Sequence, residues 1–334
     1  MSIRNPILIQ AMSFMQNKAN SFTVYGIILL LGLTIMGCKK EKMLEPSNAD
    51  ENYLVVHDNP NDPVDHAIFQ FYESTGIASF YNDTIFRKQV GDSAGIPRYV
   101  YVRLTPGYSP LGSDELRLTL TQAKQQIPSF LSFIKNEVLP KLPKGIFIPS
   151  FLIVDSFATV LPRSFMIPAD GWEAFQGFNT VVIKNRNVEV MSTEERKMRA
   201  VSILAGLAAK NLIASQNARL QKDFYIISRN ITRPVINEDI YQSFDISFMY
   251  PPPVPATEEL GFIHYIIYYD FFDGVEYIYT LPPREEDDLR MYLFAVLYYT
   301  PQEFNSKYPD YPSVLDKFNI MREIAKNMGF ELPE

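Results

Sequence analysis

The stretch STEERKMRAVSILAGLAAKNLIAS, residues 192–215, lies beyond the middle of this 334-residue chain and governs the prediction of its architecture. Ser192 is followed three residues later by Glu195, a spacing typical of a capping box, in which each residue satisfies an amide of the first helical turn. Apolar residues then recur at steps of three and four until nearly every side of the helix is apolar. The sequence therefore predicts a long helix inside a hydrophobic core.

The N-terminal segment has the features of a secretory signal. A basic front precedes the apolar run VYGIILLLGLTIM, residues 24–36, which is too short to span a bilayer comfortably. The run leads into IMGC, residues 35–38, which resembles a bacterial lipobox, where a peptidase cuts before the cysteine and the cysteine becomes acylated. We therefore expect a signal peptide over residues 1–37 and lipidation of Cys38.

The composition limits what the rest of the chain can be. Cys38 is the only cysteine, so no intrachain disulfide is expected, and the hydrophobic fraction of 47% excludes general disorder. The net charge of −7 argues against a nucleic-acid surface, and we expect no nucleic-acid partner. The polar residues 38–61 read as a tether between lipid and protein. Residues 62–334 are predicted to form one domain.

Strand patterns mostly come first along this domain and a run of helices follows, which indicates an α+β fold. A helix is expected from Pro63, with Gly76 as a left-handed cap. Pro128 is expected to start or kink a second helix within residues 120–142. Residues 230–256 form a long excursion, either functional or loosely ordered. Strands are also predicted at 77–86 (with a turn at 82–83), 98–104, 146–154, 177–184, 187–191 and 223–227. Two aromatic strands are expected within 260–281. Further helices are expected from 285 and over 314–328.

The histidines argue against a zinc site. Only His57, His66 and His264 exist, and no two are four residues apart, so a helical H-E-x-x-H motif cannot be built. We expect no metal site and no zinc or other cofactor. Four acids, at residues 285–288, open a predicted helix. They could bind a hard cation, but the helix dipole and solvation explain them more simply.

A tyrosine-rich segment offers a candidate binding surface. Tyrosine and phenylalanine alternate through residues 262–279, which is typical of two core strands. If the rings were exposed instead, they could stack on sugar faces. The candidate ligand-binding residues are Tyr265, Tyr268, Tyr269 and Tyr277.

Several segments, in their order along the chain, resemble a known family. They are PVDHAIFQFYESTGIASFYND (63–83), FLSFIKNEVLPKLPKGIFIPSFLIV (130–154), EEDDLRMYLFAVLYYTPQEF (285–304) and VLDKFNIMREIAKNMGF (314–330). Together they look like the lipoprotein zinc metallohydrolases found beside outer-membrane importers of the starch-utilisation type. The resemblance implies a single zincin-like metallopeptidase domain, in which a small mixed sheet packs on several long helices.

The chain departs from this family at the helix that should bind zinc. The resemblance would place the two histidine ligands at Ile203 and Leu207 and the general-base glutamate at Leu204. Aliphatic side chains cannot bind zinc, so the catalytic role does not carry over and no catalytic residue is assigned.

The family resemblance, taken together with the missing zinc motif, implies a non-catalytic outer-membrane lipoprotein, on the cell surface or the periplasmic face. It would act as a binding or accessory component of a glycan or peptide import system, beside a TonB-dependent importer and its surface lipoprotein. Two alternatives stay open. One is a peptidase or glycosidase that uses other residues, such as the acids at 285–288, and the other is a structural envelope lipoprotein.

Overall fold

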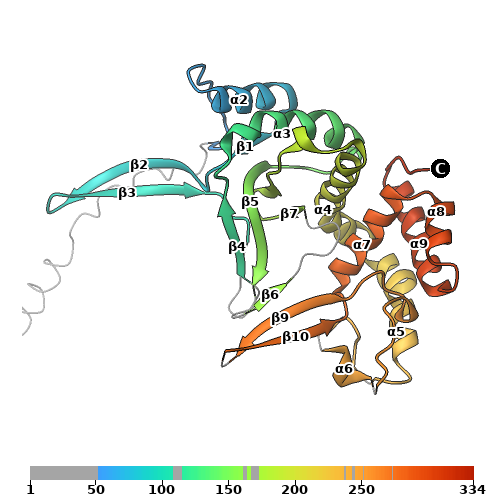
Figure 1. The fold of residues 1–334 in the computed structure, drawn as a ribbon. Helices are drawn as coiled ribbons and strands as arrows, with labels where there is room; N and C mark the ends of the chain where they lie inside the picture. Colours follow the sequence, from blue (N-terminus) through green and yellow to red (C-terminus); the bar gives the residue numbers. More distant parts are fainter. Residues whose placement is uncertain are drawn as a thin grey trace, which may run out of the picture. The chain divides into compact units, whose positions relative to one another are not determined.

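The computed structural model describes residues 52–107, 115–160, 164–166, 173–236, 238–242, 245–250, 252–272 and 274–334. The predicted signal peptide and Cys38 lie outside these residues. Residues Tyr53–Glu334 form one unit of mixed helices and small sheets, which confirms the α+β prediction (Figure 1).

A mixed sheet forms the centre of this unit. β1 (Ala78–Phe80), β5 (Ser150–Val160) and β8 (Val181–Lys184) run parallel, whereas β7 (Ala174–Gln176) pairs antiparallel with β8. β4 (Glu115–Leu120) also pairs antiparallel, with the second half of β5. The sheet therefore has a parallel centre with antiparallel strands beside it.

Alternation along β5 divides the core between the two faces of this sheet. Phe151 and Ile153 belong to the large cluster that the helices cover, while Leu152 and Val154 belong to a smaller cluster on the opposite face. The large cluster is built with α2 (Pro63–Thr75), α3 (Ile127–Phe133) and α4 (Thr193–Arg219).

The remaining helices extend the same core. α4 continues through a π turn, Leu220–Phe224, into α5 (Tyr225–Thr232), so the strand predicted at 223–227 is wrong. The described helices that follow are α6 (Ile246–Met249), α7 (Glu285–Tyr298), α8 (Pro301–Lys307) and α9 (Pro312–Asn327). In the described part of the chain, one helical stretch, Thr193–Thr232, is long and apolar enough to cross a membrane. Much of it is buried within the unit, as the core helix of a soluble protein would be.

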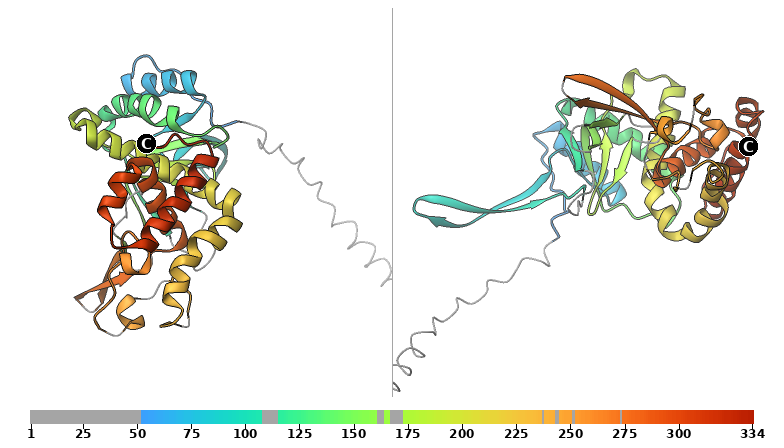
Figure 2. Two further views of the ribbon diagram at one scale, coloured as in Figure 1. Left: turned by 90° about the vertical axis from the view of Figure 1, so that its right-hand side faces the viewer. Right: turned by 90° about the horizontal axis from the view of Figure 1, so that it is seen from below.

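Two further β structures lie outside the central sheet. β2 (Thr84–Ser93) and β3 (Ile96–Arg103) form a hairpin whose side chains are largely exposed and which extends away from the helices (Figures 1 and 2). A second sheet has the order β10 (Val275–Leu281), β9 (Ile266–Phe272) and β6 (Ser164–Met166). The predicted aromatic strand pair is therefore confirmed, but its expected place in the core is wrong for β10, where Val275, Tyr277 and Ile278 are exposed.

The structure confirms the predicted capping signals. Ser192 and Glu195 form the capping box of α4, with the Glu195 amide donating to Ser192 Oγ at 3.2 Å and the Ser192 amide donating to Glu195 Oε2 at 2.7 Å. Gly76, with a φ of 72°, ends α2 in the left-handed conformation that glycine adopts without strain. Pro128 lies in the first turn of α3 and so starts that helix.

Two predicted strands differ from the structure for identifiable reasons. β5 starts at Ser150 rather than 146, because Pro149 has no amide hydrogen to donate to a strand ladder. Residues 187–191 hold a short 3-10 turn, Val188–Val190, because the Asn187 side chain accepts from the Glu189 amide. The helix predicted within 120–142 is confirmed, because helical turns follow one another from Lys124 to Lys141, with the regular α-helix over Ile127–Phe133 and a π turn over Ile134–Val138.

Candidate functional site

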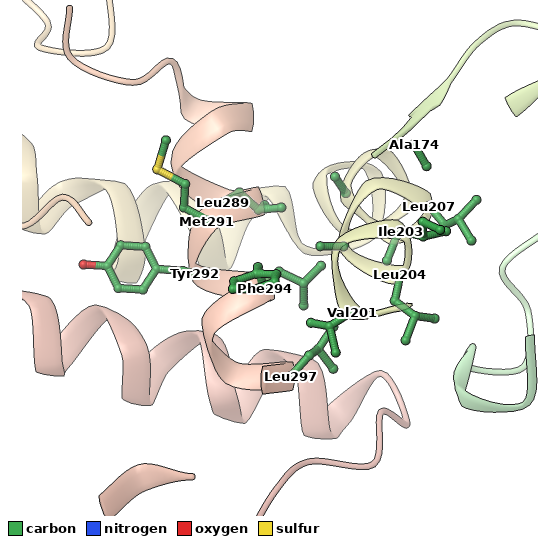
Figure 3. Packing of buried hydrophobic residues seen from close by; sticks show 14 of the residues in the cluster. Ala174, Val201, Ile203, Leu204, Leu207, Leu289, Met291, Tyr292, Phe294 and Leu297 are labelled. Atoms are coloured by element: carbon green, nitrogen blue, oxygen red, sulfur yellow. The ribbon is translucent and has the colours of Figure 1, made fainter. Parts of the chain in front are cut away.

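The three positions aligned with a zinc motif lie deep in the core on α4. Ile203 is 0% exposed, and Leu204 and Leu207 are each 1% exposed. In Figure 3, Val201 points towards α7, whereas Ile203 and Leu207 lie on the side of Ala174 in β7. Their burial confirms the prediction that this helix lies inside a hydrophobic core. That these positions correspond to the zinc-motif positions of the family stays a prediction.

Gly206 brings α4 unusually close to the edge of the central sheet. A Cβ atom added at Gly206 would lie 2.3 Å from the backbone oxygen of Ala174 in β7. Backbone cannot move aside as a flexible side chain can, so only glycine fits between this helix and this strand. The contact leaves no room for a ligand between α4 and β7.

The described residues contain no group of three or more histidine, cysteine, aspartate or glutamate side chains placed to hold a metal ion. His66 is engaged on α2, where its Nδ1 lies 2.7 Å from Asp58 Oδ1 and its Nε2 lies 2.8 Å from Gln70 Nε2. His57 and His264 are both exposed. The structure therefore brings no two of the three histidines together in a metal site.

The acids at the start of α7 lead to a charged cluster inside the core. Asp288 and Lys317 are both completely buried, and Lys317 Nζ donates to Asp288 Oδ2 over 2.5 Å. Tyr241 donates its hydroxyl hydrogen to the same oxygen at 2.8 Å, and Lys317 also donates to Ser228 Oγ at 3.1 Å. These contacts join α5, α7, α9 and the excursion at 230–256, whose described part is thus ordered around Tyr241.

Burial opposes charge on both members of this pair. Loss of hydration raises the pKa of the Asp288 carboxyl and lowers the pKa of the Lys317 ammonium to about 8, while the attraction between the two groups acts in the opposite direction. Asp288 Oδ1 has no hydrogen-bond partner among the described residues. The cluster stabilises one arrangement of distant segments, but its carboxyl is closed off from any substrate.

The other acids of the group are also engaged. Arg229 binds Glu285 and makes two-pronged hydrogen bonds to Asp239, and Arg290 pairs with Glu286 one turn away. Burial raises the pKa of Asp287 to about 6. The interpretation of these acids as a solvated helix start is therefore wrong for Asp287 and Asp288, which are 4% and 0% exposed.

The tyrosine candidates have different surroundings. Tyr265 is half-buried and donates its hydroxyl hydrogen to the carbonyl of Pro255 at 2.9 Å. Tyr277 is 43% exposed, and its ring stacks beside Tyr279 with centroids 6.5 Å apart. The side chains of Tyr268 and Tyr269 lie outside the described part of the structure, although their backbone pairs with Tyr279 and Ile278 of β10. The binding role of these four tyrosines therefore stays a prediction.

A pocket that sequence reasoning missed lies between α2, β1 and the segment before α2. It has a volume of about 230 Å³. Its polar lining includes Asp65 of α2, Ser79 of β1 and Tyr81 just after that strand, and Tyr81 donates its hydroxyl hydrogen to Asp65 Oδ1 at 2.9 Å. The available signal was the alternation of Ser79 and Tyr81, which places both on one face, but nothing local linked them to Asp65.

Comparison with known proteins identifies no relative of this chain. The chain matches no protein-family model, no curated protein and no solved structure.

Proposed function

We propose that this protein is a non-catalytic relative of the importer-associated zinc metallohydrolases, with a zincin-like domain. It would act as a lipid-anchored binding or accessory component of a nutrient import system at the outer membrane. The observation that carries the proposal is the buried state of Ile203, Leu204 and Leu207 on the central helix. A helix that meets the central sheet at Gly206 and buries only aliphatic groups at these positions offers neither ligands nor space for a metal.

The fold is consistent with this proposal. A small mixed sheet packs against α4, and α4 is the long helix that follows β7 and β8, where the resemblance places the zinc helix. The lipid anchor and the importer partner are proposed from the IMGC segment and from the family resemblance.

The geometry gives less support to a hydrolase built on the acids at 285–288. A general acid or base must reach the substrate atom with which it exchanges a proton. Asp288 is completely buried and bonded to Lys317 and Tyr241, and Glu285 is held by Arg229. The acids instead fasten α7 to its neighbours.

Metal analysis tests the catalytic half of the proposal. We expect the full-length mature lipoprotein, purified without chelators, to contain well under one zinc per chain and to cleave no member of a peptide library. A zinc peptidase carried through the same purification is the control. One zinc per chain together with peptide turnover would contradict the proposal.

Labelling tests the anchor. We expect incorporation of a clickable palmitate analogue and recovery in the outer-membrane fraction, with both lost in Cys38→Ser. Cross-linking of the lipidated protein in cells, followed by mass spectrometry, should then capture a TonB-dependent importer. Soluble, unlabelled protein in the wild type would overturn this part of the proposal.

A further inference from the structure

The pocket between α2, β1 and residues 55–57 carries an inference of its own. Its polar lining comes from segments that are apart in sequence, with His57 before α2, Asp65 within it and Ser79 on β1. Apolar walls are supplied by five other lining residues, which are Val55, Val56, Ile68, Phe80 and Ile85. A concave apolar pocket with a few converging polar groups is typical of a small-molecule site.

Ser79 is the residue that points to a ligand. Its side chain is 1% exposed, yet its hydroxyl has no hydrogen-bond partner among the described residues. A buried hydroxyl without a partner is destabilising, so such groups normally bind protein, water or ligand. Because Ser79 lines the pocket, a ligand group there could supply the missing hydrogen bond.

The other polar groups indicate the chemistry of this ligand. Asp65 can only accept hydrogen bonds when ionised, Tyr81 already donates to Asp65 and keeps lone pairs to accept, and Asn82 offers both donors and an acceptor. Such a lining suits neighbouring hydroxyl groups, each of which both donates and accepts. The half-buried ring of Phe80 adds an apolar surface against which C–H groups can pack.

Charge and size narrow the ligand class. The carboxylate of Asp65 disfavours an anion, and both of its oxygens already accept hydrogen bonds, from Tyr81 and Asn59, so it is less available to pair with a cation. The volume of about 230 Å³ lies below the roughly 300–1,000 Å³ of pockets that take drug-sized molecules. We propose that this pocket binds a single sugar ring or a similar neutral polyhydroxylated molecule.

A sugar-binding pocket would give the proposed accessory protein its ligand class, and it rests on the proposed function only for its biological context. A zinc-loaded, active enzyme would overturn the proposed function and leave the pocket to be judged by its own titration. Absence of sugar binding would overturn the pocket assignment and leave the zinc result unchanged.

The test is a titration of the full-length lipoprotein in detergent micelles, followed by saturation-transfer NMR. The probes are D-glucose, D-galactose, D-mannose and D-xylose, with choline and inorganic phosphate as cationic and anionic comparisons. We expect saturable binding of at least one sugar and none of choline or phosphate. Failure of all four sugars, or preferential binding of choline or phosphate, would overturn the inference.

Variants locate the binding and separate it from folding. Ser79→Ala removes the unpartnered hydroxyl, so we expect an unchanged or higher melting temperature but about tenfold weaker sugar binding. Ser79→Val replaces the hydroxyl by bulkier methyl groups at the pocket wall and should weaken sugar binding at least as much. Ser74→Ala, at the end of α2 where the hydroxyl donates to the Phe71 carbonyl, is the matched control and should bind like wild type. Unaltered binding by Ser79→Ala and Ser79→Val would overturn the inference.

Discussion

α4 and α7 face each other in the same core but are buried by different means (Figure 3). The middle of α4 buries aliphatic side chains such as Ile203 and Leu204, which need no hydrogen-bond partner. The first turns of α7 bury Asp287, Asp288 and Arg290, whose polar groups lose water. Apolar burial depends on volume and shape, whereas charged burial depends on partners from other segments. The free energy of unfolding should therefore fall more when one partner of the buried charges on α7 is removed than when one apolar side chain of α4 is changed.

Removal of the ammonium at residue 317 should have the largest effect. Lys317→Met leaves the Asp288 carboxyl buried without its cation, and we expect the free energy of unfolding to fall by about 3–5 kcal/mol. Urea unfolding followed by circular dichroism would measure the change. Lys326→Met, at an exposed site of α9, is the control and should be near neutral.

The double variant Lys317→Met/Asp288→Leu sharpens this result. Replacement of both charges by apolar groups should recover most of the lost stability, because no unpaired charge stays in the core. A change below about 1 kcal/mol in Lys317→Met alone would show that the buried pair is not what makes α7 sensitive.

On α4, the main loss of stability should come from a cavity left in the core. Leu204→Ala removes buried methyl groups and should lower the free energy of unfolding by about 2–5 kcal/mol, whereas the volume-conserving Leu204→Met should lower it by less than about 1.5 kcal/mol. Met198→Ala, 44% exposed on the same helix, is the control. If Leu204→Met were as damaging as Lys317→Met, the contrast between the two helices would fail.

Asp287 should make stability depend on pH. Its pKa is raised to about 6 in the folded protein, against about 3.9 in an unfolded chain, so the folded state holds the proton more tightly. Stability should therefore fall as pH rises from about 4 to above 6, by about 2–3 kcal/mol from this group. Urea midpoints at four pH values would show the slope. Asp287→Asn should flatten it and exposed Asp316→Asn should not, whereas an unchanged slope in Asp287→Asn would assign it to other groups.

The smallest loss of stability should come from the N-terminal cap of α4. Ser192→Ala removes the hydroxyl that accepts from the Glu195 amide, and a lost N-cap of this kind lowers stability by about 1 kcal/mol. Thermal unfolding would detect it. Ser215→Ala, whose exposed hydroxyl only donates to the Asn211 carbonyl within the helix, should leave the melting temperature close to wild type. Equal melting temperatures for the two variants would mean that the capping box adds nothing.

The predictions that succeeded were local. The capping box, the left-handed cap at Gly76 and the apolar periodicity of α4 each involve residues within a few positions of one another, so their geometry follows from the chain itself. The strand predicted at 223–227 failed because a short apolar run fits either structure, and packing of α4 into α5 favoured the helix.

The sequence by itself determined the α+β class, the starts of α2, α4 and α7, and the absence of an H-E-x-x-H motif from the whole chain. Only the tertiary structure decided which groups meet. It places Lys317 against Asp288 across 29 positions, and Asp65 against Tyr81 across 16. The physical reason is that such pairs have no local spacing to reveal them. Their partners are selected by which helix faces pack together and which polar groups lose water when they do.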